Sequence, residues 1–194
     1  MRPERRRART LLIGTFLIFF LPIVGAWLLN LFAPDWRPFG TVNNGILVQP
    51  VRPISAEGLK ALDGAKLGAD YLQGRWTLVH LLEGPCRQIC IDALARTRQV
   101  QQALGDDMNR VQRLLVLATP NHARSIDKHP HLALAVATSE WLASFSFVDN
   151  GAGQALGIYL VDPQGYLMMR YPLNTDQGGL LADIERLLKI SKIG

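Results

Sequence analysis

The chain has 194 residues, of which 48% are hydrophobic, enough for one ordinary domain and an attached segment. Its formal net charge is +5, from 21 basic and 16 acidic residues. Five arginines and one glutamate lie within residues 1–10, so the rest of the chain carries 16 basic and 15 acidic residues. Because nucleic-acid binding needs a basic surface, this near-neutral remainder excludes nucleic acid as an expected partner.

The first predicted element is an apolar helix at residues 11–32. This stretch carries no charge, and about 20 apolar residues are enough to cross the hydrocarbon core of a membrane. A cleavable signal peptide would have an apolar region of only roughly 7–15 residues and a small-residue cleavage site, which the sequence does not show. We therefore expect a transmembrane helix. The basic tail, residues 1–10, predicts a cytoplasmic N-terminus, with the C-terminal domain on the other side of the lipid bilayer.

Residues 33–54 contain four prolines and an Asn-Asn-Gly turn, which predict a juxtamembrane linker. Residues 55–71 carry irregularly spaced apolar residues among three glycines and predict a short helix or a hairpin. We accordingly expect the folded domain to cover residues 55–194.

Two short apolar runs, residues 76–82 and 113–118, are typical of buried strands. Between them, apolar positions recur every three or four residues from Cys90 to Leu104, which predicts an amphipathic helix. We expect this helix to end near Gly105, with Asp106 and Asp107 beginning a loop.

The second half of the domain continues with strands and helices. Residues 132–137 alternate in size and predict a strand, and Ser139 is the candidate N-cap of a short helix. Residues 156–161 and 166–171 flank an Asp-Pro-Gln-Gly turn and predict an antiparallel hairpin, followed by a helix over residues 177–189. This order predicts an α/β domain with the layout of the thioredoxin fold, behind a single N-terminal transmembrane helix.

The only two cysteines, Cys86 and Cys90, lie where the first buried strand passes into the helix. Side chains four residues apart share one face of a helix, so the pair permits either a disulfide or two thiolates on one soft metal ion. The helix N-terminus and Arg87 favour a thiolate, and Cys86 is the predicted nucleophile. A permanent structural disulfide is the alternative. The sequence has no second cysteine pair, which argues against structural zinc.

Three stretches between about Gly74 and Tyr171 resemble the Sco/SenC family: GRWTLVHLLEGPCRQIC, LLVLATPN and IYLVDPQGYLMMRYP. Members of that family are membrane-anchored thioredoxin-like proteins that deliver copper to, or manage the thiols of, the copper centre of cytochrome c oxidase subunit II. The chain is also similar to small transmembrane proteins encoded beside bacterial cytochrome oxidase genes. The resemblance implies that Cys86 and Cys90 are the two copper-ligating cysteines, and that Cu(I) is the metal.

The family's third copper ligand is a histidine in a Val-Asp-His stretch before the hairpin, and the sequence has Val148-Asp149-Asn150 instead. His80, six residues before Cys86, is a candidate replacement, with a position in the core as the alternative. We expect the other three histidines, His122, His129 and His131, to be solvated loop residues.

We therefore predict an accessory factor for the assembly of respiratory cytochrome c oxidase, in the bacterial inner membrane with its domain in the periplasm. Its Cys86/Cys90 dithiol would act on thiols or Cu(I) of a partner, which would be an oxidase subunit or another assembly factor. Two alternatives stay open. One is a periplasmic thiol-disulfide oxidoreductase, although the C-x3-C spacing differs from the C-x2-C of thioredoxins. The other is a redox-inert interaction module.

Overall fold

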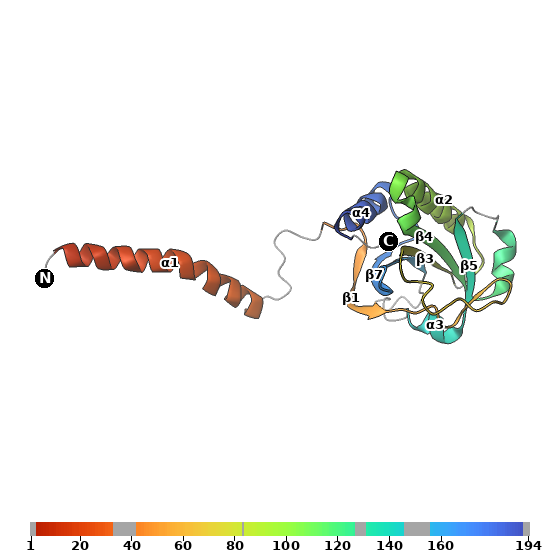
Figure 1. Ribbon diagram of the computed structural model, residues 1–194, viewed down its shortest axis with the longest axis horizontal. Helices are drawn as coiled ribbons and strands as arrows, with labels where there is room; N and C mark the ends of the chain where they lie inside the picture. The colour runs from red at the N-terminus through yellow and green to blue at the C-terminus, as the bar shows by residue number, and fades with distance from the viewer. Residues whose placement is uncertain (1–2, 33–41, 83, 127–130, 146–155, 192–194) are drawn as a thin grey trace. The chain divides into compact units, whose positions relative to one another are not determined.

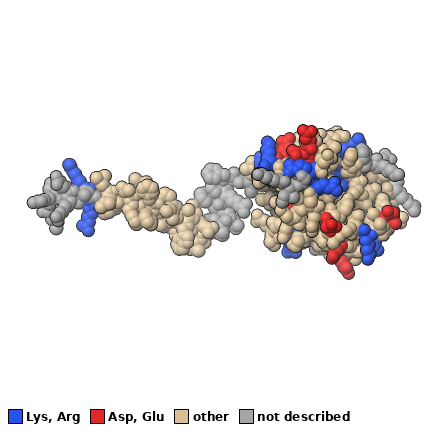
Figure 2. Space-filling view, in the orientation of Figure 1, with Lys and Arg blue, Asp and Glu red and all other residues tan. Residues whose placement is uncertain are grey.

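A computed structural model describes residues 3–32, 42–82, 84–126, 131–145 and 156–191 of the chain (Figure 1). The chain divides into two compact units, Met1–Val42 and Asn43–Gly194. In the first unit, α1 extends over Pro3–Phe32. Its stretch Arg9–Phe32 is 24 residues long and apolar enough to cross a membrane. In Figure 2 the charged side chains of α1 lie only at its N-terminal end, as the predicted membrane span requires.

The second unit is built on a mixed sheet of seven strands among the described residues, in the order β1-β7-β6-β3-β4-β5-β2. β3, β4 and β5 are parallel, and the other pairs are antiparallel. The strands are β1 (Ile46–Pro53), β2 (Leu59–Ala61), β3 (Trp76–Leu82), β4 (Val111–Leu117), β5 (Leu132–Ala137), β6 (Gly157–Val161) and β7 (Tyr166–Tyr171). The predicted α/β order and the predicted β6–β7 hairpin are confirmed.

Helices cover both faces of the sheet. The α-helices of this unit are α2 (Gln88–Ala103), α3 (Ser139–Ala143) and α4 (Gln177–Ile190), and two 3₁₀ helices are η1 (Gly105–Arg110) and η2 (Pro120–Ser125). Figure 1 shows α2 and α4 on one side of the sheet and α3 on the other. Because successive strand residues point to opposite faces, β3 contributes Leu78 to the core beneath α2 and α4, and Val79 to the core beside α3.

The segment expected to be a linker, residues 33–54, differs from that prediction in its second half. Residues 46–53 form β1, which pairs with β7 so that Ile46 lies opposite Arg170. Pro50 and Pro53 are compatible with this strand because β1 is at the edge of the sheet, where a missing N–H interrupts no ladder on the outer side. The folded unit therefore begins at Asn43 rather than at residue 55.

A buried carboxylate holds the start of this unit. Asp183, on α4, is 3% exposed. It accepts hydrogen bonds from the backbone N–H of Asn44 (2.8 Å) and of Gly45 (2.9 Å) and from the Tyr171 hydroxyl (3.1 Å). Burial, and then the neighbouring carboxylate, raises the pKa of Tyr171, so its hydroxyl stays protonated and donates. We call these four residues the Asp183 clamp.

Three local predictions are settled by the structure. The N-cap of α3 is Thr138, whose side chain accepts from the N–H of Trp141, and not Ser139. The segment leading into β3 contains a hairpin, since Lys60 pairs with Lys66, and not a helix. The loop expected after Gly105 is the 3₁₀ helix η1.

Candidate functional site

The cysteines lie at the junction that the sequence predicts. β3 ends at Leu82, Cys86 precedes the N-cap residue Arg87, and Cys90 lies in the first turn of α2. The N–H of Cys90 donates to the Arg87 carbonyl at 2.9 Å, which starts the helix one residue after the cap. This turn has no side-chain cap and no acidic residue, so the positive end of the helix dipole is not neutralised within it.

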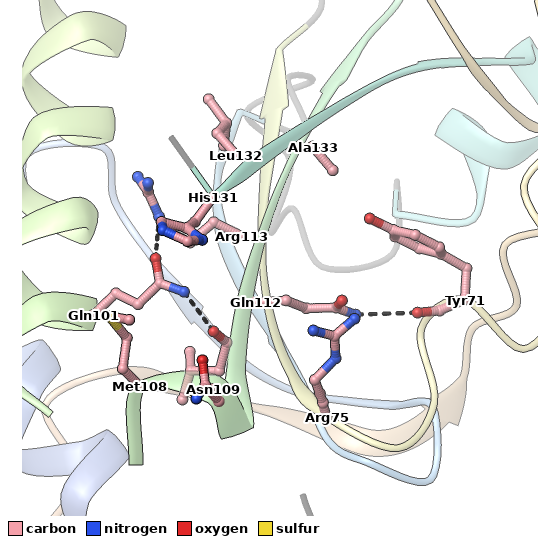
Figure 3. Close-up of a pocket in the computed structure, with 11 residues that line it drawn as sticks. Tyr71, Arg75, Gln101, Met108, Asn109, Gln112, Arg113, His131, Leu132 and Ala133 are labelled. Carbon is pink, nitrogen blue, oxygen red and sulfur yellow. Dashed lines mark hydrogen bonds between the residues drawn. The ribbon is translucent and has the colours of Figure 1, made fainter. Parts of the chain in front are cut away.

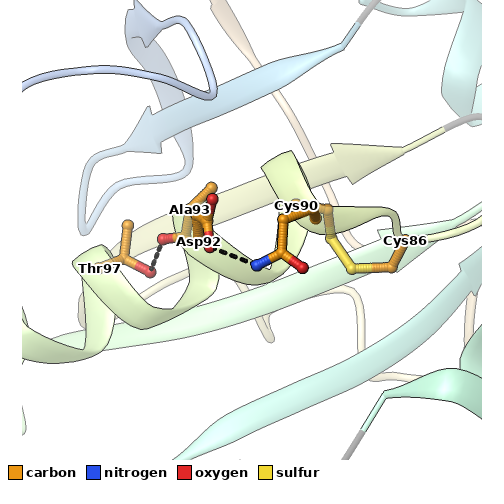
Figure 4. Close-up of a disulfide and its surroundings, with 6 residues drawn as sticks. Cys86, Cys90, Asp92, Ala93 and Thr97 are labelled. Atoms are coloured by element: carbon orange, nitrogen blue, oxygen red, sulfur yellow. Dashed lines mark hydrogen bonds between the residues drawn. A yellow bond between two sulfur atoms is a disulfide. The ribbon is translucent and has the colours of Figure 1, made fainter.

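Cys86 and Cys90 form a disulfide, with their Cα atoms 5.3 Å apart (Figure 4). Of the two states that the spacing permits, the structure therefore shows the oxidised one. Cys86 is 7% exposed and Cys90 is 2% exposed. Both pack in a small apolar cluster with Leu82, Leu94, Leu115 and Leu117 at the carboxyl ends of β3 and β4.

A groove of about 430 Å³ lies beside this disulfide, with Cys90 among its lining residues. Leu82, Pro85 and Cys90 line it from the strand-to-helix junction, and Leu156 and Leu173 line it from much later in the chain. We call it the Cys90 groove. Its lining is mainly apolar, so it suits an extended segment that carries apolar side chains beside a reactive thiol.

Two arginines support the far wall of the Cys90 groove. A guanidinium N–H of Arg96, on α2, donates to the Leu173 carbonyl, and one of Arg170, on β7, lies 3.5 Å from the Leu156 carbonyl. Sequence reasoning missed this wall. The only local signal is two isolated leucines next to strands, and nothing in such a pattern indicates that they face the cysteines.

His80 is held in the core and away from the cysteines. It is 1% exposed, and its Nε2 lies 3.0 Å from the Thr97 hydroxyl on α2. Thr97 follows Cys90 by seven residues, which is about 10 Å of helix rise. Burial, and then the charge of Arg113, lowers the pKa of His80 to about 3, so the ring is neutral. His80 thus occupies the core position that the sequence left as the alternative to a ligand.

Of the other three histidines, which the sequence predicts to be solvated loop residues, two lie within the described residues. His122 is half-buried in η2, and His131 is exposed just before β5. His129 and the stretch 148–150 lie outside the described residues. Within the part of the chain that the structure describes, no group of three or more His, Cys, Asp or Glu side chains is placed to hold a metal ion.

Comparison with solved structures finds the same fold in Sco proteins. Yeast Sco1 with copper bound is 17% identical, with 77% of this chain and 95% of that chain covered at a TM-score of 0.54. Arabidopsis thaliana ScoI with copper bound is 18% identical, with coverages of 72% and 98% and a TM-score of 0.55. Apo Sco1 from Thermus thermophilus is 17% identical, with coverages of 76% and 99% and a TM-score of 0.56. At these identities the likeness concerns the fold, and it confirms the Sco/SenC-like resemblance at that level.

The comparison with curated protein sequences gives no match. A family model matches residues 76–191, which is more than half of the chain and runs from the start of β3 to the end of α4. The matched part contains the disulfide, the Cys90 groove and the hairpin. The chain belongs to the family described as transmembrane-like, thioredoxin-like, C-terminal domain.

Proposed function

We propose that this chain is a membrane-anchored accessory factor for the assembly of respiratory cytochrome c oxidase, and that Cys86 and Cys90 act on thiols or Cu(I) of a partner. Residues 1–10 would be cytoplasmic, residues 11–32 would span the inner membrane, and the folded unit would lie in the periplasm. The partner would be an oxidase subunit or another assembly factor, as the Sco/SenC resemblance implies. The observation that carries the proposal is the cysteine pair at the uncapped start of α2, with the Cys90 groove beside it.

The disulfide supplies a balanced route for thiol exchange. A partner thiolate attacks one sulfur of the Cys86–Cys90 bond, forms a mixed disulfide and releases the other cysteine as a thiolate. A second partner thiolate then attacks the partner sulfur of the mixed disulfide and releases the remaining cysteine as a thiolate. The partner is thereby oxidised by two electrons to a disulfide, and both cysteines are reduced. The same two steps in reverse, starting from the reduced cysteines, reduce a partner disulfide and free its thiols for copper. The start of α2 stabilises the released thiolate.

The reduced pair also suits Cu(I) as cargo. In the disulfide the sulfurs are bonded to each other and offer no thiolate, so metal transfer requires the reduced form. Two thiolates one helical turn apart are soft ligands of the kind that Cu(I) prefers. Any third ligand would come from the partner protein, which would take the metal over from the two cysteines.

A titration of the full chain in detergent with Cu(I), against a competing chelator, tests the cargo role. After reduction, we expect one Cu(I) per chain to be withheld from the chelator, and none in the C86S/C90S double variant. The unreduced protein is the matched control, because its sulfurs are blocked without any substitution. If the reduced chain withholds no more Cu(I) than this control, the copper role is wrong.

The burial of both cysteines favours a second candidate, a redox-inert interaction module that keeps the fold and a structural disulfide. A reduction potential below about −300 mV would support this candidate, since such bonds resist the glutathione pool. Oxidase activity in cells that carry the C86A/C90A variant separates the chemical roles from the interaction module. Normal activity would exclude both thiol exchange and Cu(I) transfer and would leave the interaction module.

A further inference from the structure

A second hollow, of about 300 Å³, lies at the end of the parallel strands opposite the disulfide (Figure 3). Its walls include Arg75, just before β3, Gln112 and Arg113, at the start of β4, and His131, just before β5. The cysteines follow the other end of β3, after Leu82. The hollow is therefore separate from the Cys90 groove.

On the α2 side of the sheet, one residue that lines the hollow carries a buried positive charge. Arg113 is 1% exposed and donates from Nε to Gln101 Oε1 (2.9 Å) and from Nη1 to the Leu94 carbonyl (3.1 Å). Gln101 is fixed in turn, because its Nε2 donates to the Val111 carbonyl at 2.6 Å. Burial, and then Arg98, lowers the pKa of Arg113 to about 10, so the guanidinium is still charged at neutral pH.

On the opposite face of the sheet, Gln112 is buried and its amide is fixed, since Nε2 donates to the Tyr71 carbonyl (3.0 Å) and to Thr77 Oγ1 (2.8 Å). Figure 3 shows Arg75 close to Gln112 on this side. Arg75 is exposed, and its backbone carbonyl accepts from Thr77 Oγ1 at 3.4 Å. Its guanidinium makes no hydrogen bond or ion pair with the described residues. Its guanidinium is therefore available to a ligand in the hollow.

His131 adds a third nitrogen-bearing group to the wall. Its backbone has φ 61°, in the left-handed region that residues other than glycine seldom adopt. Its imidazole is exposed and has no hydrogen-bond partner among the described residues. Within the part of the chain that the structure describes, eleven residues line the hollow, and none of them is Asp or Glu. The acidic residue of η1 nearest in sequence to this wall, Asp107, is paired with Arg110 at 2.9 Å.

We propose that this hollow, which we call the Arg75–Arg113 pocket, binds a small soluble polyanion with two or more carboxylate or phosphate groups. Cationic groups lie on both faces of the sheet end, so one anionic group would meet Arg75 and another would lie over Arg113 beside His131. The prearranged side chains Gln101 and Gln112 keep the walls in place, so binding needs little reorganisation. The volume, at the lower limit of ligand pockets, selects a small molecule.

Calorimetric titration of the full chain in nonionic detergent, at pH 7 and constant ionic strength, tests the proposal with citrate and with pyrophosphate. We expect saturable binding of at least one probe, and much weaker binding of acetate, which carries one charge. Arg75→Gln removes a charge-assisted hydrogen bond and should weaken binding by about tenfold or more. His131→Asn should also weaken it, and asparagine tolerates the left-handed backbone, so the wall keeps its shape.

Lys66→Gln is the matched control, because it removes the same charge from an exposed residue outside the pocket. Affinity for the anion should stay close to that of the parent chain. Two results overturn the proposal: no saturable binding of either probe up to millimolar concentration, or an equal loss of affinity in Arg75→Gln and Lys66→Gln. Nanodiscs that contain phosphatidylglycerol distinguish the source of the anion. If the chain no longer binds citrate in these nanodiscs, the pocket binds a lipid headgroup, and the proposal of a soluble ligand is wrong.

Discussion

Replacing Asp183 by asparagine tests whether one carboxylate closes the folded unit. The carboxylate accepts from the N–H groups of Asn44 and Gly45, from the Tyr171 hydroxyl, and from Asn44 Nδ2 at 3.1 Å. An asparagine amide has no charge and offers one oxygen in place of two, so the three donors that share Oδ2 lose the charge of their acceptor and Asn44 Nδ2 loses its bond to Oδ1. With the side chain only 3% exposed, and about 1.5–3 kcal/mol for each hydrogen bond to a charged group, we expect the free energy of unfolding to fall by about 3–4 kcal/mol.

Thermal unfolding of the full chain in detergent, followed by near-UV circular dichroism, measures this effect on the folded unit. A loss of this size corresponds to a Tm lower by about 6–16 °C for a domain of about 150 residues. Glu185→Gln is the matched control, because it removes the same charge from an exposed position on α4 and should change stability by no more than about 0.5 kcal/mol. If the two variants unfold at the same temperature, the Asp183 clamp contributes nothing and the reasoning is wrong.

Three further predictions concern a titration, a helix cap and the membrane topology. Folding lowers the pKa of His80 from 6.5 to about 3. The neutral ring therefore contributes fully to the free energy of unfolding above pH 6.5, and this contribution is lost as the pH falls towards 3. Urea midpoints between pH 7 and pH 4 should therefore decline less steeply in His80→Gln, and parallel declines would contradict this. Thr138→Ala should lower stability by about 1 kcal/mol while Ser139→Ala has little effect, and the reverse order in urea unfolding would assign the cap to Ser139. Alkaline phosphatase fused after residue 194 should be active and a fusion at residue 10 inactive, whereas the opposite pattern would place the domain in the cytoplasm.

The sequence predicts most elements well because their signals are local. β3 and β4 are apolar runs between turn residues, and the spacing from Cys90 to Leu104 specifies one face of α2. The cysteine pair is predictable for the same reason. A separation of four residues at a helix start brings two side chains together whatever the rest of the fold does, and the structure joins them as a disulfide.

Features that depend on long-range packing could not be predicted in this way. β1 contains two prolines, and only its position at the sheet edge, beside β7, makes them compatible with a strand. The Asp183 clamp joins residues 139 positions apart, and a single aspartate on an amphipathic helix is not distinguishable by pattern from a solvated one. The Arg75–Arg113 pocket likewise combines residues that lie just before or at the start of three different strands.

The sequence by itself determined the apolar N-terminal helix, the order of the strands and α-helices from β3 onwards, and the proximity of Cys86 and Cys90, because each depends on neighbours within a few residues. Only the tertiary structure decided that both sulfurs are buried and that Leu156 and Leu173 complete a groove beside them. The same holds for His80, which Thr97 keeps in the core. The physical reason is that burial and access are set by elements that meet in space from distant parts of the chain, and no local pattern records which of them will meet.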